Sequence, residues 1–75
     1  MLNTKIHELR REKKINQSEL AAIVGVRRET IVCLENGKYN PSLKLAMRIA
    51  RYFNMTVEEI FFFDEEDFDP ELDQK

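Results

Sequence analysis

The sequence has few of the residues that form disulfides or bind metal ions in small proteins. Its 75 residues include one cysteine, one histidine and no tryptophan, which argues against an internal disulfide framework and a structural zinc site. No apolar run approaches the roughly 20 residues that span a bilayer, and the first residues lack a signal-peptide pattern. We therefore expect a soluble protein of the reducing cytoplasm, with no metal and no membrane partner.

The sequence also lacks the arrangements that carry catalysis. Its few Ser, His, Asp and Cys residues show no arrangement typical of nucleophilic catalysis, and it has no phosphate-binding loop. A chain of this length buries only about 60% of its unfolded surface, which leaves little room for an enzyme cleft beside a scaffold. We expect a single domain that is not an enzyme and needs no cofactor and no small-molecule ligand.

The net charge of −2 is the sum of two opposite parts. Residues 1–54 carry eleven Lys and Arg against five Glu, a balance of +6, whereas residues 55–75 carry nine acids and one Lys, a balance of −8. This asymmetry predicts a basic module with an acidic end. We assign residues 1–63 to the module and residues 64–75 to an acidic tail.

Capping residues and apolar periodicity predict five short helices. Asn3 or Thr4 is expected to cap a first helix that runs to about residue 14. The later helices are expected at residues 17–24, 28–36 and 43–53, with a short one opening at residue 57. Capping boxes begin at Asn16 and Thr56, and Ser42 caps the fourth helix.

Glycines and apolar side chains complete this pattern. Gly25 and Gly37 end the second and third helices, because the residue after a helix often adopts the left-handed conformation. The second helix is expected to bury Leu20, Ala21 and either Ile23 or Val24. The inward residues of the fourth are expected to be Leu43, Ala46, Ile49, Ala50 and Phe53.

Residues 17–34 fit the helix-turn-helix pattern position by position. Ala21 is small where two helices cross, Gly25 lies in the turn, and the buried positions hold Leu20, Val24, Val26, Ile31 and Leu34. The flanking run is Leu34-Glu35-Asn36-Gly37-Lys38-Tyr39-Asn40-Pro41-Ser42-Leu43. Over residues 4–61 the chain resembles the Cro/phage-repressor-type (xenobiotic-response-element) family of transcriptional regulators. The resemblance implies an all-α, five-helix, lambda-repressor-like bundle, with terminal β-strand pairing as an alternative for the chain ends.

The resemblance also implies double-stranded DNA as the partner, with the third helix in the major groove. The expected base contacts are Arg27, Arg28, Glu29, Val32 and Cys33. Arg28 suits the O6 and N7 atoms of guanine, Glu29 a cytosine amino group or the orientation of Arg28, and Val32 a thymine methyl. The expected phosphate contacts are Gln17, Asn36, Lys38, Tyr39 and Asn40.

Position 27 departs from the family, which usually has Ser or Thr there to cap the third helix. Arg27 cannot accept a hydrogen bond from the helix amides, and the lost cap costs roughly 1 kcal/mol. This cost suggests that Arg27 is kept for a DNA contact. Cys33 has two interpretations, a small residue near DNA or a redox switch that blocks docking, and we favour the first.

Arg10 and Glu35 match positions that form a buried ion pair between the first and third helices in this family. A bidentate pair would hold the third helix against the first. His7 has no partner motif, so we expect an ordinary surface or half-buried histidine.

The run Ile60-Phe61-Phe62-Phe63 is too apolar to lie wholly in water. Three successive rings cannot share one face, so we expect part of the run in the core and part in a homodimer interface. We place the dimerisation segment near residues 52–63, with Phe61, Phe62 and Phe63 as its interface residues.

The acidic tail has three interpretations: a solvating end, a competitor of DNA phosphates for the basic module, or a docking strip for another protein. The sequence as a whole predicts a sequence-specific, dimeric DNA-binding transcriptional regulator that acts as a repressor. The alternative is a protein-interaction module, such as an antitoxin or anti-repressor, on the same fold.

Overall fold

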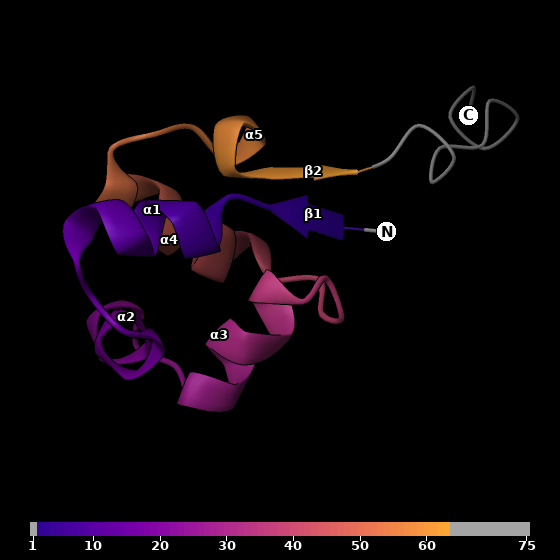
Figure 1. Ribbon diagram of the computed structural model, residues 1–75. Helices are drawn as coiled ribbons and strands as arrows, with labels where there is room; N and C mark the ends of the chain where they lie inside the picture. The colour runs from indigo at the N-terminus through magenta and orange to yellow at the C-terminus, as the bar shows by residue number, and fades with distance from the viewer. Residues whose placement is uncertain (1, 64–75) are drawn as a thin grey trace, which may run out of the picture.

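The computed structural model describes residues 2–63, which form five helices and one two-stranded sheet (Figure 1). In chain order these are β1 (Leu2–Thr4), α1 (Ile6–Lys13), α2 (Gln17–Val24), α3 (Arg28–Glu35), α4 (Leu43–Phe53), α5 (Val57–Ile60) and β2 (Phe61–Phe63). The predicted five-helix bundle with strand pairing is confirmed. None of these five helices has the length and apolar content to cross a membrane. The predicted acidic tail lies outside the described residues.

Local capping residues set the starts of α2, α4 and α5 as predicted. The side chain of Asn16 accepts from the amide of Glu19 at 2.7 Å, and the Glu19 carboxylate accepts from the amide of Asn16 at 3.0 Å. Thr56 and Glu59 form the same reciprocal pair before α5. Ser42 caps α4 through its side chain. These bonds satisfy amides that a helix leaves unpaired at its first turn.

The turn between α2 and α3 depends on Gly25. Its φ of +78° lies in the left-handed region, where a side chain is strained. The guanidinium of Arg48 on α4 donates to the carbonyl of Val24 at 3.4 Å, and it would lie 3.4 Å from a Cβ at position 25. The end of α2 is therefore held from α4 as well as from its own turn.

The core draws on all five helices. Its fully buried large side chains are Ile6, Leu20, Ile31, Leu34, Ile49 and Ile60. Of the two alternatives on α2, Val24 is buried and Ile23 is half exposed. The expectation for Leu43 is wrong: it is 73% exposed, and Leu45 is buried in its place. The row at positions 45, 49 and 53 faces the core, which turns the first residue of α4 outward.

The start of α1 also differs from the expectation. Asn3 and Thr4 lie in β1, and the N-cap of α1 is Lys5, which forms no side-chain cap. The hydroxyl of Thr4 does accept from the amide of Ile6, at 3.4 Å. Capping by Asn3 or Thr4 was expected from local sequence, whereas pairing with a distant segment draws both residues into a strand.

That distant segment is β2. It runs antiparallel to β1, with Leu2 opposite Phe63 and Thr4 opposite Phe61. In Figure 1 the two strands project together from the side of the bundle, above α3. The ladder therefore joins both ends of the described chain, and its strand β1 lies beside α3.

Candidate nucleic-acid interface

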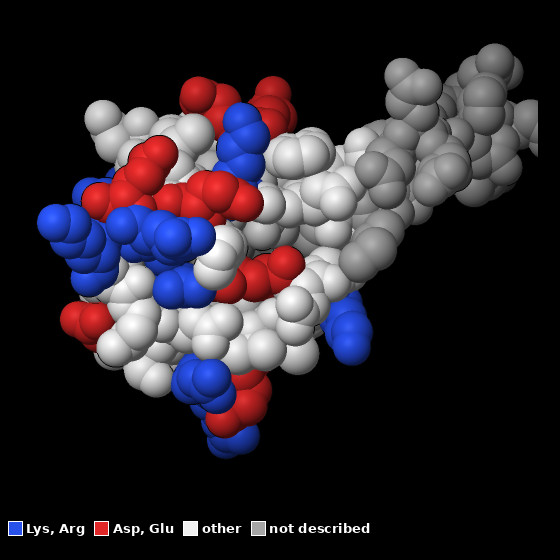
Figure 2. All heavy atoms as spheres, in the orientation of Figure 1, with Lys and Arg blue, Asp and Glu red and all other residues white. Residues whose placement is uncertain are grey.

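Helix α3 buries one face and leaves the other open. Ile31 and Leu34 are fully buried against the core. Arg28 and Glu29, in its first turn, are exposed, as is Arg27 just before it. Figure 2 shows basic and acidic side chains projecting together at the bottom of the view, where α3 begins in Figure 1. The predicted base-contact residues therefore include a charged, exposed group at one helix end.

The start of α3 is built without a side-chain cap. Arg27 is the N-cap residue, with extended backbone, and its side chain makes no cap hydrogen bond. Its carbonyl accepts from the amide of Thr30 at 3.0 Å. Two cations, Arg27 and Arg28, thus stand at the positive end of the helix dipole, which disfavours them electrostatically. This arrangement suits an anionic partner better than it suits the isolated chain.

The second half of the exposed face meets the loop that follows α3. Gly37 has a φ of +70°, and the amide of Lys38 donates to the carbonyl of Cys33 at 2.9 Å. The loop therefore folds back onto the helix. A shallow hollow between them is lined by Glu29, Thr30, Cys33, Lys38 and Tyr39.

Of the remaining predicted contacts, Val32, Asn36 and Asn40 do not line this hollow. Val32 and Cys33 are half-buried, and Asn36 and Asn40 are exposed. Asn40 lines a different hollow, beside Pro41. Sequence reasoning did not select Thr30, although it lies one turn before Cys33 on the same helix, and that spacing was a usable signal.

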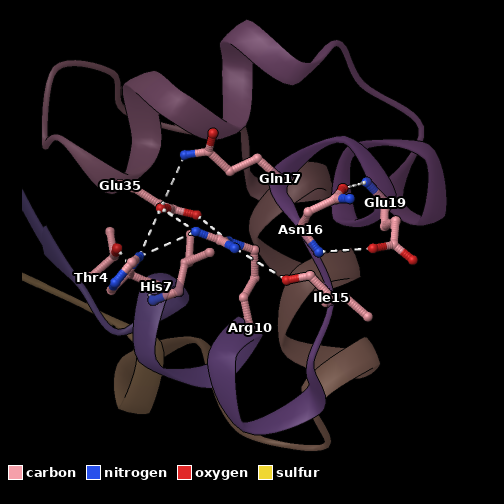
Figure 3. Close-up of polar contacts among 9 residues, drawn as sticks. Thr4, His7, Arg10, Ile15, Asn16, Gln17, Glu19 and Glu35 are labelled. Atoms are coloured by element: carbon pink, nitrogen blue, oxygen red, sulfur yellow. Dashed lines mark hydrogen bonds and ion pairs between the residues drawn. The ribbon is translucent and has the colours of Figure 1, made fainter.

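Behind the exposed face, Arg10 and Glu35 form the ion pair that the resemblance implied (Figure 3). Nε of Arg10 donates to Oε2 of Glu35 at 2.7 Å, and Nη2 donates to Oε1 at 3.0 Å. The two side chains are only 10% and 7% exposed. The guanidinium also donates through Nη1 to the carbonyl of Ile15 at 3.1 Å. The pair joins α1, the segment after it and the last residue of α3.

Two further residues join this pair, and sequence reasoning missed both contacts. Nδ1 of His7 lies 3.2 Å from Nη2 of Arg10 and 3.5 Å from Oε1 of Glu35. Nε2 of Gln17 donates to the same Oε1 at 3.3 Å. The spacing of three residues between His7 and Arg10 on α1 was the available signal. Figure 3 shows the four side chains converging from α1, α2 and α3.

The pKa of the Glu35 carboxylate, at the centre of this network, is lowered from its ordinary value. Burial alone would raise the pKa of Glu35, but the hydrogen bonds from Arg10 and Gln17, with the positive charge of Arg10, lower it. The hydrogen bond to Glu35 raises the pKa of Arg10 in turn. Both charges are therefore held, and α3 is fixed relative to α1 and α2.

The side chain of Gln17, one of the expected phosphate contacts, makes a hydrogen bond within the folded chain. The amide group of that side chain is engaged by Glu35 at 3.3 Å, so its nitrogen faces the ion pair within the folded chain. Gln17 is the first residue of α2, and its backbone stands at the positive end of that helix.

The aromatic run of β2 divides between core and surface. Phe61 is 9% exposed and belongs to the core, whereas Phe62 and Phe63 are 42% and 45% exposed. Strand alternation places the side chains of Phe62 and Phe63 on opposite faces of the sheet. Phe61 thus packs in the core of the single chain, and Phe62 and Phe63 supply the exposed aromatic surface of this run.

Comparison with known proteins agrees with this architecture. The helix-turn-helix family model matches residues 6–60. An HTH-type transcriptional regulator of Archaeoglobus fulgidus is 62% identical over 66 residues, covering 88% of this chain and 93% of its own. The HTH-type transcriptional regulator YgzD of Bacillus subtilis is 40% identical, covering 87% and 98%.

A phage protein extends the match. The cryptic phage CTXphi transcriptional repressor RstR of Vibrio cholerae is 31% identical over 75 residues, covering 100% of this chain and 68% of its own. The match includes the two helices, the turn at Gly25 and the loop after α3 described above. The chain belongs to the Cro/phage-repressor-type family of helix-turn-helix transcriptional regulators.

Proposed function

We propose that this regulator binds specific sites in double-stranded DNA as a homodimer and represses transcription by occupying a promoter. The observation that carries the proposal is the start of α3, where Arg27, Arg28 and Glu29 are exposed. The ion pair of Arg10 with Glu35 fixes this helix on its buried side. The similarity to RstR, which is named a transcriptional repressor, supports the sign of regulation. Such a protein acts where the DNA is, in the cytoplasm.

In this proposal α3 lies in the major groove and its exposed residues contact bases. Arg28 donates two hydrogen bonds to O6 and N7 of a guanine, the commonest specific contact. Glu29 accepts from a cytosine amino group, and Val32 packs on a thymine methyl. Arg27 and Cys33 flank these contacts at the two ends of the exposed face.

The loop after α3 and the start of α2 contact phosphates. Lys38 and Tyr39 are exposed beside the exposed face of α3, and Asn36 and Asn40 stand on either side of them. Gln17 contributes its backbone amide at the positive end of α2. These contacts position the protein on the duplex without selecting a sequence.

A second copy of the chain completes the dimeric DNA-binding unit. Phe62 and Phe63 supply the dimer contact, since both are about half exposed on a short strand. Two-fold symmetry then places two recognition helices about 34 Å apart, on successive turns of one face of the duplex. The operator is expected to be a pseudo-palindrome.

The experiment is selection of binding sites from a random duplex pool, followed by affinity measurements on the selected site. Arg28→Ala is expected to weaken binding to that site by about 1–3 kcal/mol and to relax the preference at one base pair. Arg11→Ala is the matched control, because Arg11 is an exposed arginine on α1. Failure of the wild-type chain to enrich any sequence would overturn the proposal in favour of the protein-interaction alternative.

A further inference from the structure

The outward face of α4 carries a row of cations that the proposed DNA interface does not use. Lys44, Arg48 and Arg51 are all exposed, and their spacing places them on one side of the helix. Met47 lies among them and is 51% exposed. We refer to these four residues as the α4 band. The helix contains no Asp or Glu.

The cations of the α4 band make no ion pair within residues 2–63, although Glu59 lines the same hollow as Arg51. Across residues 2–63, the ion pairs are those made by Glu35 with Arg10 and His7. Within residues 2–63, the polar contact that the band makes is the hydrogen bond from Arg48 to the carbonyl of Val24. Three cations around an apolar methionine therefore present a surface that fits an acidic segment with apolar side chains.

The α4 band is continuous with the place where the described chain ends. Shallow hollows run along α4, and successive hollows share lining residues. One hollow reaches from Phe63 to Val57, the next from Val57 to Met47 and Arg51, and a third is lined by the α4 band itself. Phe63 is the last described residue, so residue 64 begins at one end of this path.

We propose that residues 64–75 of the same chain bind along the α4 band. This segment contains seven acids and one Lys, a balance of −6, and its apolar residues Phe68 and Leu72 are spaced among the acids. The acids complement Lys44, Arg48 and Arg51, while the apolar side chains complement Met47 and the hollows beside it. The proposal is independent of the DNA sequence that the protein recognises.

The length of the segment is sufficient for this path. Helix α4 has 11 residues and is therefore about 16 Å long, whereas twelve residues in extended conformation reach about 40 Å. Attachment at Phe63 makes the contact intramolecular, which gives the segment a high effective concentration at the band. In this position the acids are held against α4 and do not cover α3.

The test uses the full chain with a nitroxide label at position 74, in the variant Cys33→Ser/Gln74→Cys, and records amide signals by NMR. Signals of Lys44, Met47 and Arg51 are expected to lose intensity at low salt. They are expected to recover in about 1 M NaCl, where the Debye length falls to about 3 Å. In the labelled Lys44→Gln/Arg51→Gln variant the loss along α4 is expected to shrink. Lys38→Gln, which removes an exposed lysine outside the band, is the matched control and is expected to leave it unchanged.

Three outcomes would overturn the proposal. Intensity loss at Arg28 and Lys38 in place of α4 would assign the acidic segment to the DNA-facing surface. A second sample mixes an isotope-labelled chain that carries no nitroxide with a nitroxide-labelled chain of natural isotope content. Intensity loss in this mixture would place the acidic segment on a second copy. No selective loss at low salt would exclude a bound position on the α4 band.

Discussion

The guanidinium of Arg10 and the carboxylate of Glu35 meet through two hydrogen bonds, with Nε 2.7 Å from Oε2 and Nη2 3.0 Å from Oε1. The sequence separation is 25 residues, so the contact ties α1 directly to the last turn of α3. Since Gln17 donates to the same carboxylate, α2 is tied to it too. This nearly buried carboxylate therefore helps to fix the orientation of α3, the helix whose exposed face we propose contacts DNA.

Removing the cation should cost more than the ion pair itself contributes. Arg10→Met leaves Glu35 with a buried charge and without its main partner, so the free energy of unfolding is expected to fall by about 3 kcal/mol. Urea unfolding measures this loss. Arg11→Met, at the exposed neighbouring position, should change stability by no more than about 0.5 kcal/mol.

A double variant separates the cost of an unpaired buried charge from the contribution of the ion pair itself. In Arg10→Met/Glu35→Met no charge is left unpaired, so the double variant should regain most of the lost stability. A stability of Arg10→Met equal to that of the wild type would show that the pair does not hold the helices together.

The lowered pKa of Glu35 predicts a direction for acid unfolding. A carboxylate whose pKa is lower in the folded than in the unfolded chain stabilises the fold above its ordinary value of 4.5, and this contribution disappears as the pH falls through the folded-state value. The difference in unfolding free energy between wild type and Glu35→Gln should therefore be largest near pH 7 and narrow below pH 4.5. A pH-independent difference contradicts this, and Glu12→Gln, at an exposed position of α1, is the control.

Local signals predicted the helix starts at Asn16, Ser42 and Thr56, because a cap depends on residues within one turn. They failed at Asn3 and Thr4, where pairing with β2 outweighs a local preference. The same distinction explains Leu43, whose outward position depends on which row of α4 packs on the rest of the core. Non-local contacts decided each difference.

The site divides in a similar way. The pairing of Arg10 with Glu35 was available from the family resemblance, and the missing cap at Arg27 was available from residue chemistry. The contacts of His7 and Gln17 with Glu35 join three helices, so the spacing of His7 and Arg10 within α1 indicates only part of this network. The partition of the aromatic run, with Phe61 buried, required the strand register.

Restoring a cap at the start of α3 should separate stability from DNA binding. Arg27→Ser supplies a side chain that accepts from the helix amides, and it removes a cation from the positive end of the helix. Stability is expected to rise by about 1 kcal/mol, or about 4–8 °C in Tm, while affinity for the selected DNA falls. A higher Tm with unchanged affinity would show that Arg27 makes no DNA contact.

The loop lysine should act on affinity without acting on sequence preference. Lys38→Gln removes one proposed phosphate contact, so binding should weaken by a similar factor on selected and random duplexes. The slope of log affinity against log salt should decrease in magnitude by about 0.9. Arg28→Ala provides the contrast, because its loss should be concentrated on the selected site. An unchanged salt slope for Lys38→Gln would remove this lysine from the phosphate contacts.

The exposed rings of β2 should control the oligomeric state. Phe62→Ser and Phe63→Ser each remove about half-exposed aromatic surface, and each is expected to shift the chain from a dimer toward the 8.9 kDa monomer in sedimentation at micromolar concentration. Ile23→Ser is the matched control, because Ile23 is 50% exposed on α2 and should leave the dimer intact. The ring whose replacement has the larger effect identifies the sheet face in contact with the second copy. A wild-type chain that sediments only as an 8.9 kDa species would exclude this dimer and the pseudo-palindromic operator with it.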